Sequence, residues 1–194
     1  MQMIKDLEDY LENHLQTIQS VRAALLPQIV EGAELIISAL KDGQKLLIMG
    51  NGGSAADAQH FAAEMVGRFR RERQGLPAIA LSTDTSALTA IGNDYGFDAV
   101  FSRQVEALAK PGDVVFGIST SGHSKNVIAA IQTASDIGCK TVGLLGKDGG
   151  VLSSLVTCEM TVSGTETSFI QEAHIMIIHM LCELIEKNIS GQGV

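Results

Sequence analysis

Five short apolar segments, separated by stretches of helical periodicity, constrain the fold of this chain more than any other feature. They are the predicted strands at residues 45–50, 78–82, 113–119, 140–146 and 158–163. Continuous apolar strands that alternate with helices indicate a parallel sheet covered on both faces. We therefore predict an α/β fold built on a doubly wound parallel sheet, with additional N-terminal helices.

Helical periodicity fills the segments around these strands. Apolar residues recur at helical spacing from Ile4 to Leu26, and Pro27 both ends that run and can begin the next helix, which extends to Leu40. Further helices are predicted over residues 55–70, 124–137 and 168–187.

The length and composition of the chain bound its size and its partners. Its 194 residues fit a single domain, 1–194, with N-terminal helices at 1–42 and an α/β core at 43–194. Aromatic residues make up only 4%, which disfavours a surface on which bases could stack. The formal net charge is −8, whereas a nucleic-acid partner requires a basic surface, so no such partner is expected. The basic run RFRRER at 68–73 is expected to be a solvated helix end, with a local anion or partner contact as the alternative.

Cysteine usage and apolar run length indicate where the protein acts. Cys139, Cys158 and Cys182 are widely spaced and form no CxxC pair, which is typical of small core residues in a reducing compartment. No N-terminal apolar run resembles a signal peptide, and the longest apolar stretches are expected to be too short to span a membrane. We expect a cytoplasmic protein with no membrane partner.

Two loops rich in glycine or hydroxyl groups follow predicted strands and open helices. In the first, GNGGS at residues 50–54, glycines let a ligand approach the backbone, and the helix start offers free N–H groups to an anion. Ser54 and Asp57 also match a helix-capping pair, so a ligand role and a structural role for Ser54 both stay open. The second loop, STSGHSKN, gathers four hydroxyls at a helix start, which favours a phosphate site at Ser119, Thr120, Ser121 and Ser124.

The segments TDTSA and IGNDYGFD are expected to form a third loop. Its Asn93 and Asp94 carry polar groups that can hold the hydroxyls of a sugar. Asn-Asp close to glycine is also common turn chemistry, which leaves a purely structural role open. No Walker sequence occurs in the chain, so a kinase-like nucleotide site is not expected.

Polar residues on two predicted helices complete the candidate site. His60 and Glu64 are four residues apart, so they share a helix face and can reach a common ion or proton, with an isolated ion pair as the alternative. His179 lies in an apolar stretch, where a lone histidine is usually a core residue, and Gln171 can form a capping box with Ser168. About 12 Å of helix rise separates Gln171 from His179. Binding of one ion by both would therefore need an irregular first turn or a neighbouring subunit.

Five segments together resemble the phosphoheptose isomerases, also called sedoheptulose 7-phosphate isomerases, of the sugar isomerase (SIS) family. They are GNGGSAADAQHFAAEMVGRF, TDTSALTAIGNDYGFD, GISTSGHSKNVI, GKDGG and IQEAHIMIIH, and the resemblance covers essentially the whole chain. It implies a flavodoxin-like α/β/α sandwich and a homotetramer with active sites shared between subunits. It also implies a zinc-dependent isomerase that converts sedoheptulose 7-phosphate to D-glycero-D-manno-heptose 7-phosphate, for the heptose of bacterial lipopolysaccharide core or related surface glycans.

The resemblance also assigns roles to residues of this chain. One Zn²⁺ per subunit would be held by His60, Glu64, Gln171 and His179. The sugar phosphate would contact Glu64, Gln171 and a set of loop residues, namely Asn51, Gly52, Gly53, Asn93, Asp94, Ser119, Thr120, Ser121 and Ser124. Glu64 is the candidate base and His179 the candidate acid for moving a carbonyl from C2 to C1 through an enediol.

One departure from the family pattern precedes the segment IQE. This chain has ETSF at residues 166–169, whereas many relatives have Asp or Thr, then Ala, then Arg directly before IQE, so an arginine and often an acid are missing here. Substrate preference is therefore less firmly implied than the reaction type.

Two other functions stay open on the sequence. Relatives of this fold that associate with the bacterial replication initiator share SAADAQHFAA and TAIGND with this chain. Those relatives lack a glutamate at the position of Glu64 and differ at His179, so the presence of both residues favours an enzyme. The second alternative is an isomerase of the same fold that acts on a pentose or hexose phosphate.

Overall fold

The computed structural model describes residues 2–190 and contains a five-stranded parallel sheet. The strands are β1 (Leu46–Gly50), β2 (Ala78–Ala80), β3 (Val114–Ser119), β4 (Lys140–Gly146) and β5 (Cys158–Val162). Their order in the sheet is β2-β1-β3-β4-β5, and every neighbouring pair is parallel. This is the flavodoxin-like order of a doubly wound sheet, so the predicted fold class is confirmed.

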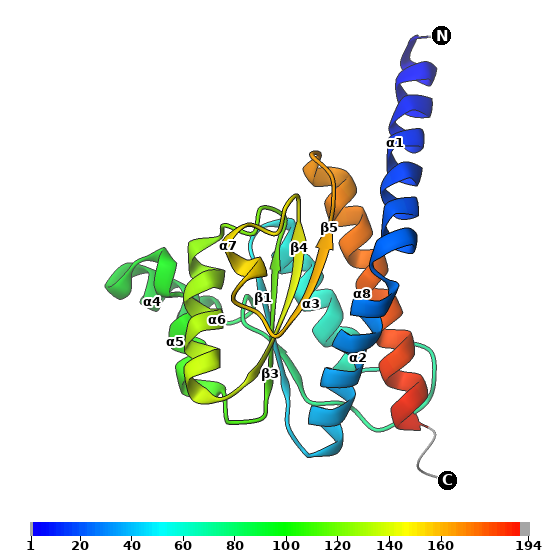
Figure 1. Ribbon diagram of the computed structural model, residues 1–194. Coiled ribbons are helices and arrows are strands. Elements are labelled where there is room, and N and C mark those ends of the chain that lie inside the picture. The colour runs from blue at the N-terminus through cyan, green and yellow to red at the C-terminus, as the bar shows by residue number, and fades with distance from the viewer. Residues whose placement is uncertain (1, 191–194) are drawn as a thin grey trace.

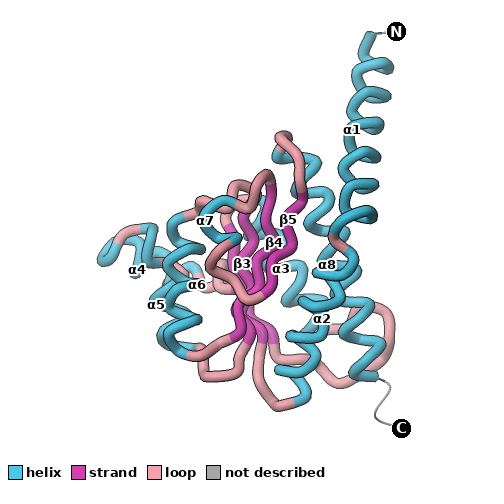
Figure 2. The backbone as a smooth tube through the Cα atoms, viewed as in Figure 1, coloured by secondary structure: helices cyan, strands magenta, loops and turns pink. Residues whose placement is uncertain are grey.

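Helices cover both faces of this sheet (Figure 1), which Figure 2 shows between two helical layers. One layer contains α2 (Leu26–Lys41), α3 (Gly53–Val66) and α8 (Thr167–Ser190), with α1 (Gln2–Ala24) beside α8. The other contains α5 (Ser102–Leu108), α6 (Lys125–Ile137) and the short α7 (Gly150–Ser153). Between β2 and α5 lie α4 (Thr85–Tyr95) and a 3-10 turn at Phe97–Ala99.

The strands separate two apolar cores. On β1, Leu46 and Ile48 join the core formed with α2, α3 and α8, whereas Leu47 and Met49 join the core on the opposite face. Successive side chains of a strand point to opposite faces. Because both faces are covered, every residue of β1 is buried, which explains why the strand is a continuous apolar run.

The helix predicted over residues 55–70 has different bounds in the structure. α3 begins after Gly52 at its N-cap, and Ser54 is a buried residue of the first turn, so Ser54 and Asp57 do not form the capping pair. The helix ends at Val66, which places the basic run at 68–73 outside it. The prediction of a solvated helix end is therefore wrong. The backbone of that run instead donates hydrogen bonds to a buried carboxylate on α8.

The segment predicted as a third loop is largely helical. α4 begins after Asp84, whose carboxylate accepts a hydrogen bond from the Ala87 amide at 2.9 Å. Asn93 and Asp94 are exposed in the last turn of α4, where Asn93 Nδ2 donates to Asp94 Oδ1 at 2.8 Å. The loop prediction is wrong because the helix-start signal at Asp84 outweighs the turn preference of the Asn-Asp pair.

Helix α8 corrects two further expectations. By length and composition it could cross a membrane, although we expected no stretch to be long enough; it packs against α1, α2 and α3 instead, as a core helix does. It begins at Thr167, so Ser168 lies inside the helix and does not cap it with Gln171.

Candidate active site

The loops that follow β1 and β3 meet where the strand order of the sheet reverses. In doubly wound sheets, ligands bind in the crevice at the carboxyl ends of the strands at this point. The side-chain amides of Asn51 and Asn126 join the two loops through reciprocal hydrogen bonds of 2.9 Å. Asn51, a predicted sugar contact, is thereby fixed against the start of α6, with Gly52 and Gly53 exposed beside it.

The hydroxyl-rich loop after β3 is ordered by hydrogen bonds of its own. Ser119 Oγ accepts from the Gly122 amide at 3.1 Å and lies 3.0 Å from Ser124 Oγ, while Ser121 Oγ accepts from the His123 amide at 3.2 Å. A hydroxyl that accepts such a bond still has its own proton to donate. Since α6 begins immediately after this loop, hydroxyl and amide donors gather at one helix start, an arrangement suited to an anion.

A cavity of about 540 Å³ opens beside these hydroxyls. It is lined by Ser121, His123, Lys147, Asp148, Gly164 and Thr165. The loops after β3 and β4 come together at Gly122, whose φ is +66° and where a Cβ would collide with the carbonyl of Gly149. The basic side chain of Lys147 was not among the predicted contacts, because no spacing rule links the segment GKDGG to the hydroxyl-rich loop after β3. His123 lies inside that loop, but only the hydroxyl residues of the loop were predicted as contacts.

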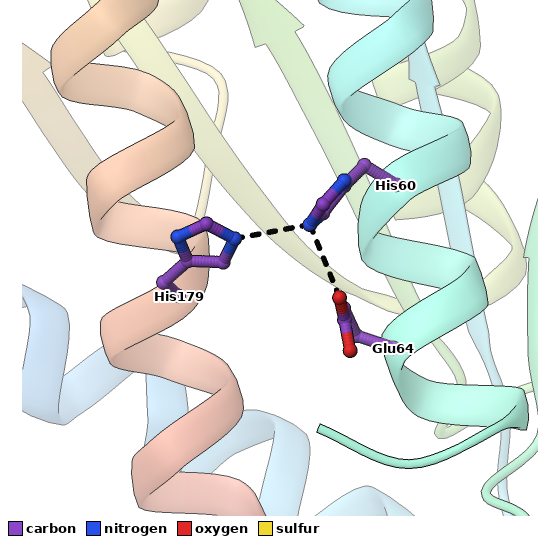
Figure 3. Close-up of side chains that lie close together, drawn as sticks. All are labelled: His60, Glu64 and His179. Carbon is purple, nitrogen blue, oxygen red and sulfur yellow. Dashed lines mark hydrogen bonds and ion pairs between the residues drawn. The ribbon is translucent and has the colours of Figure 1, made fainter. Parts of the chain in front are cut away.

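Three of the predicted metal ligands converge between α3 and α8 (Figure 3). His60 Nε2 lies 3.0 Å from His179 Nε2 and 3.2 Å from Glu64 Oε1. One ligand atom from each residue lies within 4.8 Å of the other two. The pairing of His60 with Glu64 follows from their spacing on one helix, whereas His179 arrives from a helix more than a hundred residues further along the chain.

Gln171, the fourth predicted ligand, packs against the first turn of α3. A Cβ at Gly53 would stand 2.5 Å from Gln171 Nε2, so only glycine lets the amide lie there. Because Gly53 meets Gln171 and His60 meets His179, α3 and α8 run side by side in the same direction. Within the part of the chain that the structure describes, Gln171 forms no hydrogen bond with the other three residues, and it lies in the regular helix rather than in an irregular first turn.

The donor set suits zinc. Two imidazole nitrogens and one carboxylate oxygen match catalytic zinc sites, which have three protein ligands and an open position for water or substrate. Two neutral imidazoles that face each other through Nε2 can share only one hydrogen bond, whereas a cation would engage both nitrogens. His60 and Glu64 are partly exposed, with 43% and 23% of their side chains accessible, so a ligand can reach them.

Two further titratable groups near the site have shifted pKa values. Burial raises the pKa of Asp57 to about 6, against a smaller lowering by His60. Burial also lowers the pKa of His174 to about 4, and its Nε2 lies 2.9 Å from the carbonyl of Leu145. His174 is fully buried while His179 is only partly buried. The core histidine of α8 is therefore His174, and His179 faces the site.

Comparison with known proteins assigns this chain to a family. The SIS domain family matches residues 9–146. A phosphoheptose isomerase of Geotalea uraniireducens (strain Rf4) is 59% identical over 189 residues, which are 97% of this chain and all of that protein. The chain belongs to the phosphoheptose isomerase family. Family membership, predicted from the resemblance of five segments, is confirmed.

Two solved structures of phosphoheptose isomerases share the fold. The protein from Neisseria gonorrhoeae has a TM-score of 0.91 and 45% identity, with 95% of this chain and 99% of that chain covered. The protein from Francisella tularensis has a TM-score of 0.93 and 37% identity, with 96% and 100% covered. Both likenesses span nearly the full length of this chain.

Proposed function

We infer that this protein is an aldose–ketose isomerase that converts sedoheptulose 7-phosphate to D-glycero-D-manno-heptose 7-phosphate in heptose biosynthesis. The convergence of His60, Glu64 and His179 carries this inference, in a chain 59% identical to a phosphoheptose isomerase. The heptose would serve lipopolysaccharide core or a related surface glycan.

The reaction moves a carbonyl from C2 to C1, so a proton must leave C1 and a proton must reach C2. We assign to Glu64 the removal of the C1 proton and its return to C2, and to His179 the donation of a proton to O2 and the recovery of a proton from O1. Their positions on adjacent helices would place them together across one enediol. Zinc, when bound, would polarise the substrate oxygens as a Lewis acid.

The residues proposed to hold one Zn²⁺ per subunit are His60, Glu64, His179 and Gln171. The first three are supported by ligand atoms within 4.8 Å of one another. Gln171 packs against Gly53 in this chain, so it would complete the set after a change of side-chain rotamer or from a neighbouring subunit.

The rest of the sugar phosphate would occupy the crevice at the ends of β1 and β3. The donors at the start of α6 support a phosphate position there. The proposed contacts are Asn51, Gly52, Gly53, Asn93, Asp94, Ser119, Thr120, Ser121 and Ser124, together with Glu64 and Gln171.

We also propose a homotetramer of single SIS domains in the cytoplasm. Apolar side chains along α1 support assembly, because Met3, Ile4, Leu7, Leu11 and Leu15 are all exposed. An apolar cavity of about 520 Å³ between α2 and α8 includes His179 in its lining, so a subunit docked there would border the site. Free, buried thiols at all three cysteines support a reducing compartment.

A panel of ketose phosphates tests the function. Pentose, hexose and heptose 2-ketose phosphates are each incubated with the protein, with and without added zinc after chelation, and aldose products are detected. We expect zinc-dependent product from sedoheptulose 7-phosphate. Product from a pentose or hexose alone would indicate the other isomerase class, and no product from any sugar would favour a binding module.

A further inference from the structure

A buried carboxylate lies on α8 two helical turns after His179. Glu186 is fully buried, and it accepts hydrogen bonds from three successive backbone amides, those of Phe69, Arg70 and Arg71, at 3.0, 2.8 and 2.8 Å. Burial alone would raise the pKa of Glu186, but the three amides and the nearby Arg73 outweigh it and lower the pKa below its usual value. Glu186 is therefore charged, and it fixes the backbone that follows α3.

The side chain of Arg73 connects this carboxylate to the end of α3. Only 4% of it is exposed, and its Nε lies 3.3 Å from Glu186 Oε1. Its Nη2 donates to the carbonyl of Glu64 at 2.8 Å, and its Nη1 donates to the carbonyls of Met65 and Gly67 at 2.9 and 3.3 Å. The last carbonyls of a helix have no partner within the helix. Arg73 thus caps the turn of α3 that carries Glu64.

The same backbone segment also reaches the other side of the site. The backbone amide of Phe69 donates to Glu186. The ring of Phe69 stacks on the imidazole of His179, with ring centroids 5.6 Å apart and an interplanar angle of 24°. The Arg73–Glu186 pair therefore bonds to the backbone of one proposed metal ligand and orients the aromatic neighbour of another.

Stability alone is a weak explanation for this pair. The desolvation of two buried charges often equals or exceeds their mutual attraction, and apolar side chains of similar size can fill such a space equally well. What the charged pair adds is direction, because each of its hydrogen bonds fixes a particular backbone group. We propose that Arg73 and Glu186 are positioning residues that hold Glu64 and His179 in register for metal binding, an inference that rests on the proposed function.

The test compares Glu186→Gln and Arg73→Lys with the unaltered protein. Zinc affinity of chelator-treated protein is measured by competition with a chromogenic chelator, and kcat and KM are measured with sedoheptulose 7-phosphate. Residues that orient metal ligands typically change affinity or activity by about 10–100-fold, so we expect zinc affinity and kcat to fall by that factor. KM should change little, because the hydroxyl-rich loop after β3, where we place the phosphate, does not include either residue of this pair.

Glu183→Gln is the matched control. Glu183 lies on the same helix and accepts from the Arg71 side chain at 2.8 Å, but it is partly exposed, and the backbone amides of residues 69–71 donate to Glu186 and not to Glu183 within the part of the chain that the structure describes. This variant should keep the zinc affinity of the unaltered protein. Variants of Arg73 and Glu186 that only lower the thermal midpoint, and bind zinc and turn over normally well below it, would overturn the proposal.

A measurement on the unaltered protein decides the matter if the variants do not fold. Coupling between two sites is reciprocal, so a pair that raises zinc affinity about tenfold must itself be stabilised about tenfold by zinc. We therefore expect zinc to slow hydrogen exchange at the amides of residues 69–71 by that factor, and an unchanged exchange rate would contradict the proposal. The zinc readouts need no substrate, so an absence of isomerase activity in the unaltered protein would reject the proposed function separately.

Discussion

The Nε2 atoms of His60 and His179 lie 3.0 Å apart, although 119 residues separate them in the chain. The same atom of His60 contacts Glu64, so donors from two helices converge on one point. A structural ion pair would need only His60 and Glu64. The approach of a second imidazole, from a helix that also contains a separate core histidine at 174, is what favours a metal-binding and catalytic role.

Glu64→Gln should remove the base while keeping the size of the side chain and one oxygen. We expect kcat to fall by at least about 10²-fold, the lower range for a positioned acid or base, with the thermal midpoint almost unchanged. His179→Gln should behave in the same way, and the double variant should be little worse than either single one because the two groups act together. Measurement of kcat and thermal midpoint for all three variants checks this. Near-normal turnover by Glu64→Gln would contradict the mechanism.

Ser121→Ala should weaken the binding of the phosphate. Loss of a hydrogen bond to a charged group corresponds to roughly 1–3 kcal/mol, so KM for sedoheptulose 7-phosphate should rise while the fold is retained. Ser154→Ala is the control, since Ser154 is exposed and, among the described residues, its hydroxyl bonds only to the carbonyl of Val151. Steady-state kinetics measure the difference. An equal KM for both variants would place the phosphate elsewhere.

The exposed apolar side chains of α1, Met3, Ile4, Leu7, Leu11 and Leu15, should support the proposed tetramer. Leu7 and Leu11 are 65% and 60% exposed and lie one turn apart, so Leu7→Glu with Leu11→Glu should dissociate the assembly, as measured by light scattering. Asn13→Asp adds a negative charge on the opposite face of α1, about 200° from Leu11, and should leave the assembly intact. An unaltered protein that is monomeric and fully active would refute the tetramer.

Stability should decrease between about pH 6.5 and about pH 4 because of His174. Its pKa is lowered from 6.5 to about 4 in the fold, so in this window the unfolded chain binds a proton that the folded chain does not. The free energy of unfolding should therefore fall by roughly 3 kcal/mol as pH drops through the window, and this contribution is fully present above it. Urea unfolding across the window measures the slope. His174→Gln should flatten it, and an unchanged slope in that variant would contradict the assignment.

Asp57 should have the opposite pH dependence. Its pKa is raised from 3.8 to about 6 by burial, so the folded chain retains a proton that the unfolded chain has lost, and stability falls as pH rises through this interval. In chelator-treated protein, Asp57→Asn should therefore raise the thermal midpoint at neutral pH and change it little near pH 4. A variant that is equally stabilised or destabilised at both pH values would disprove this contribution.

Local sequence determined the parallel sheet and most of the crevice that we propose binds the phosphate. Apolar runs such as residues 113–119 could be recognised as strands, because a strand that is buried on both faces consists mostly of apolar residues. The glycines after β1 and the serines after β3 could be located because loops that follow parallel strands share one edge of the sheet. His60 and Glu64 could be paired because a spacing of four residues places two side chains on one helix face regardless of the rest of the fold.

Only the tertiary structure decided which helix faces meet. Periodicity shows that a face of α8 is buried, but it does not show that His179 meets His60 while Gln171 meets Gly53. Those contacts depend on the parallel packing of α3 and α8, which is set by many buried residues distant in sequence. The basic run at 68–73 was misassigned for the same reason. Its partner, Glu186, lies more than a hundred residues away, and no local pattern reports a contact of that range.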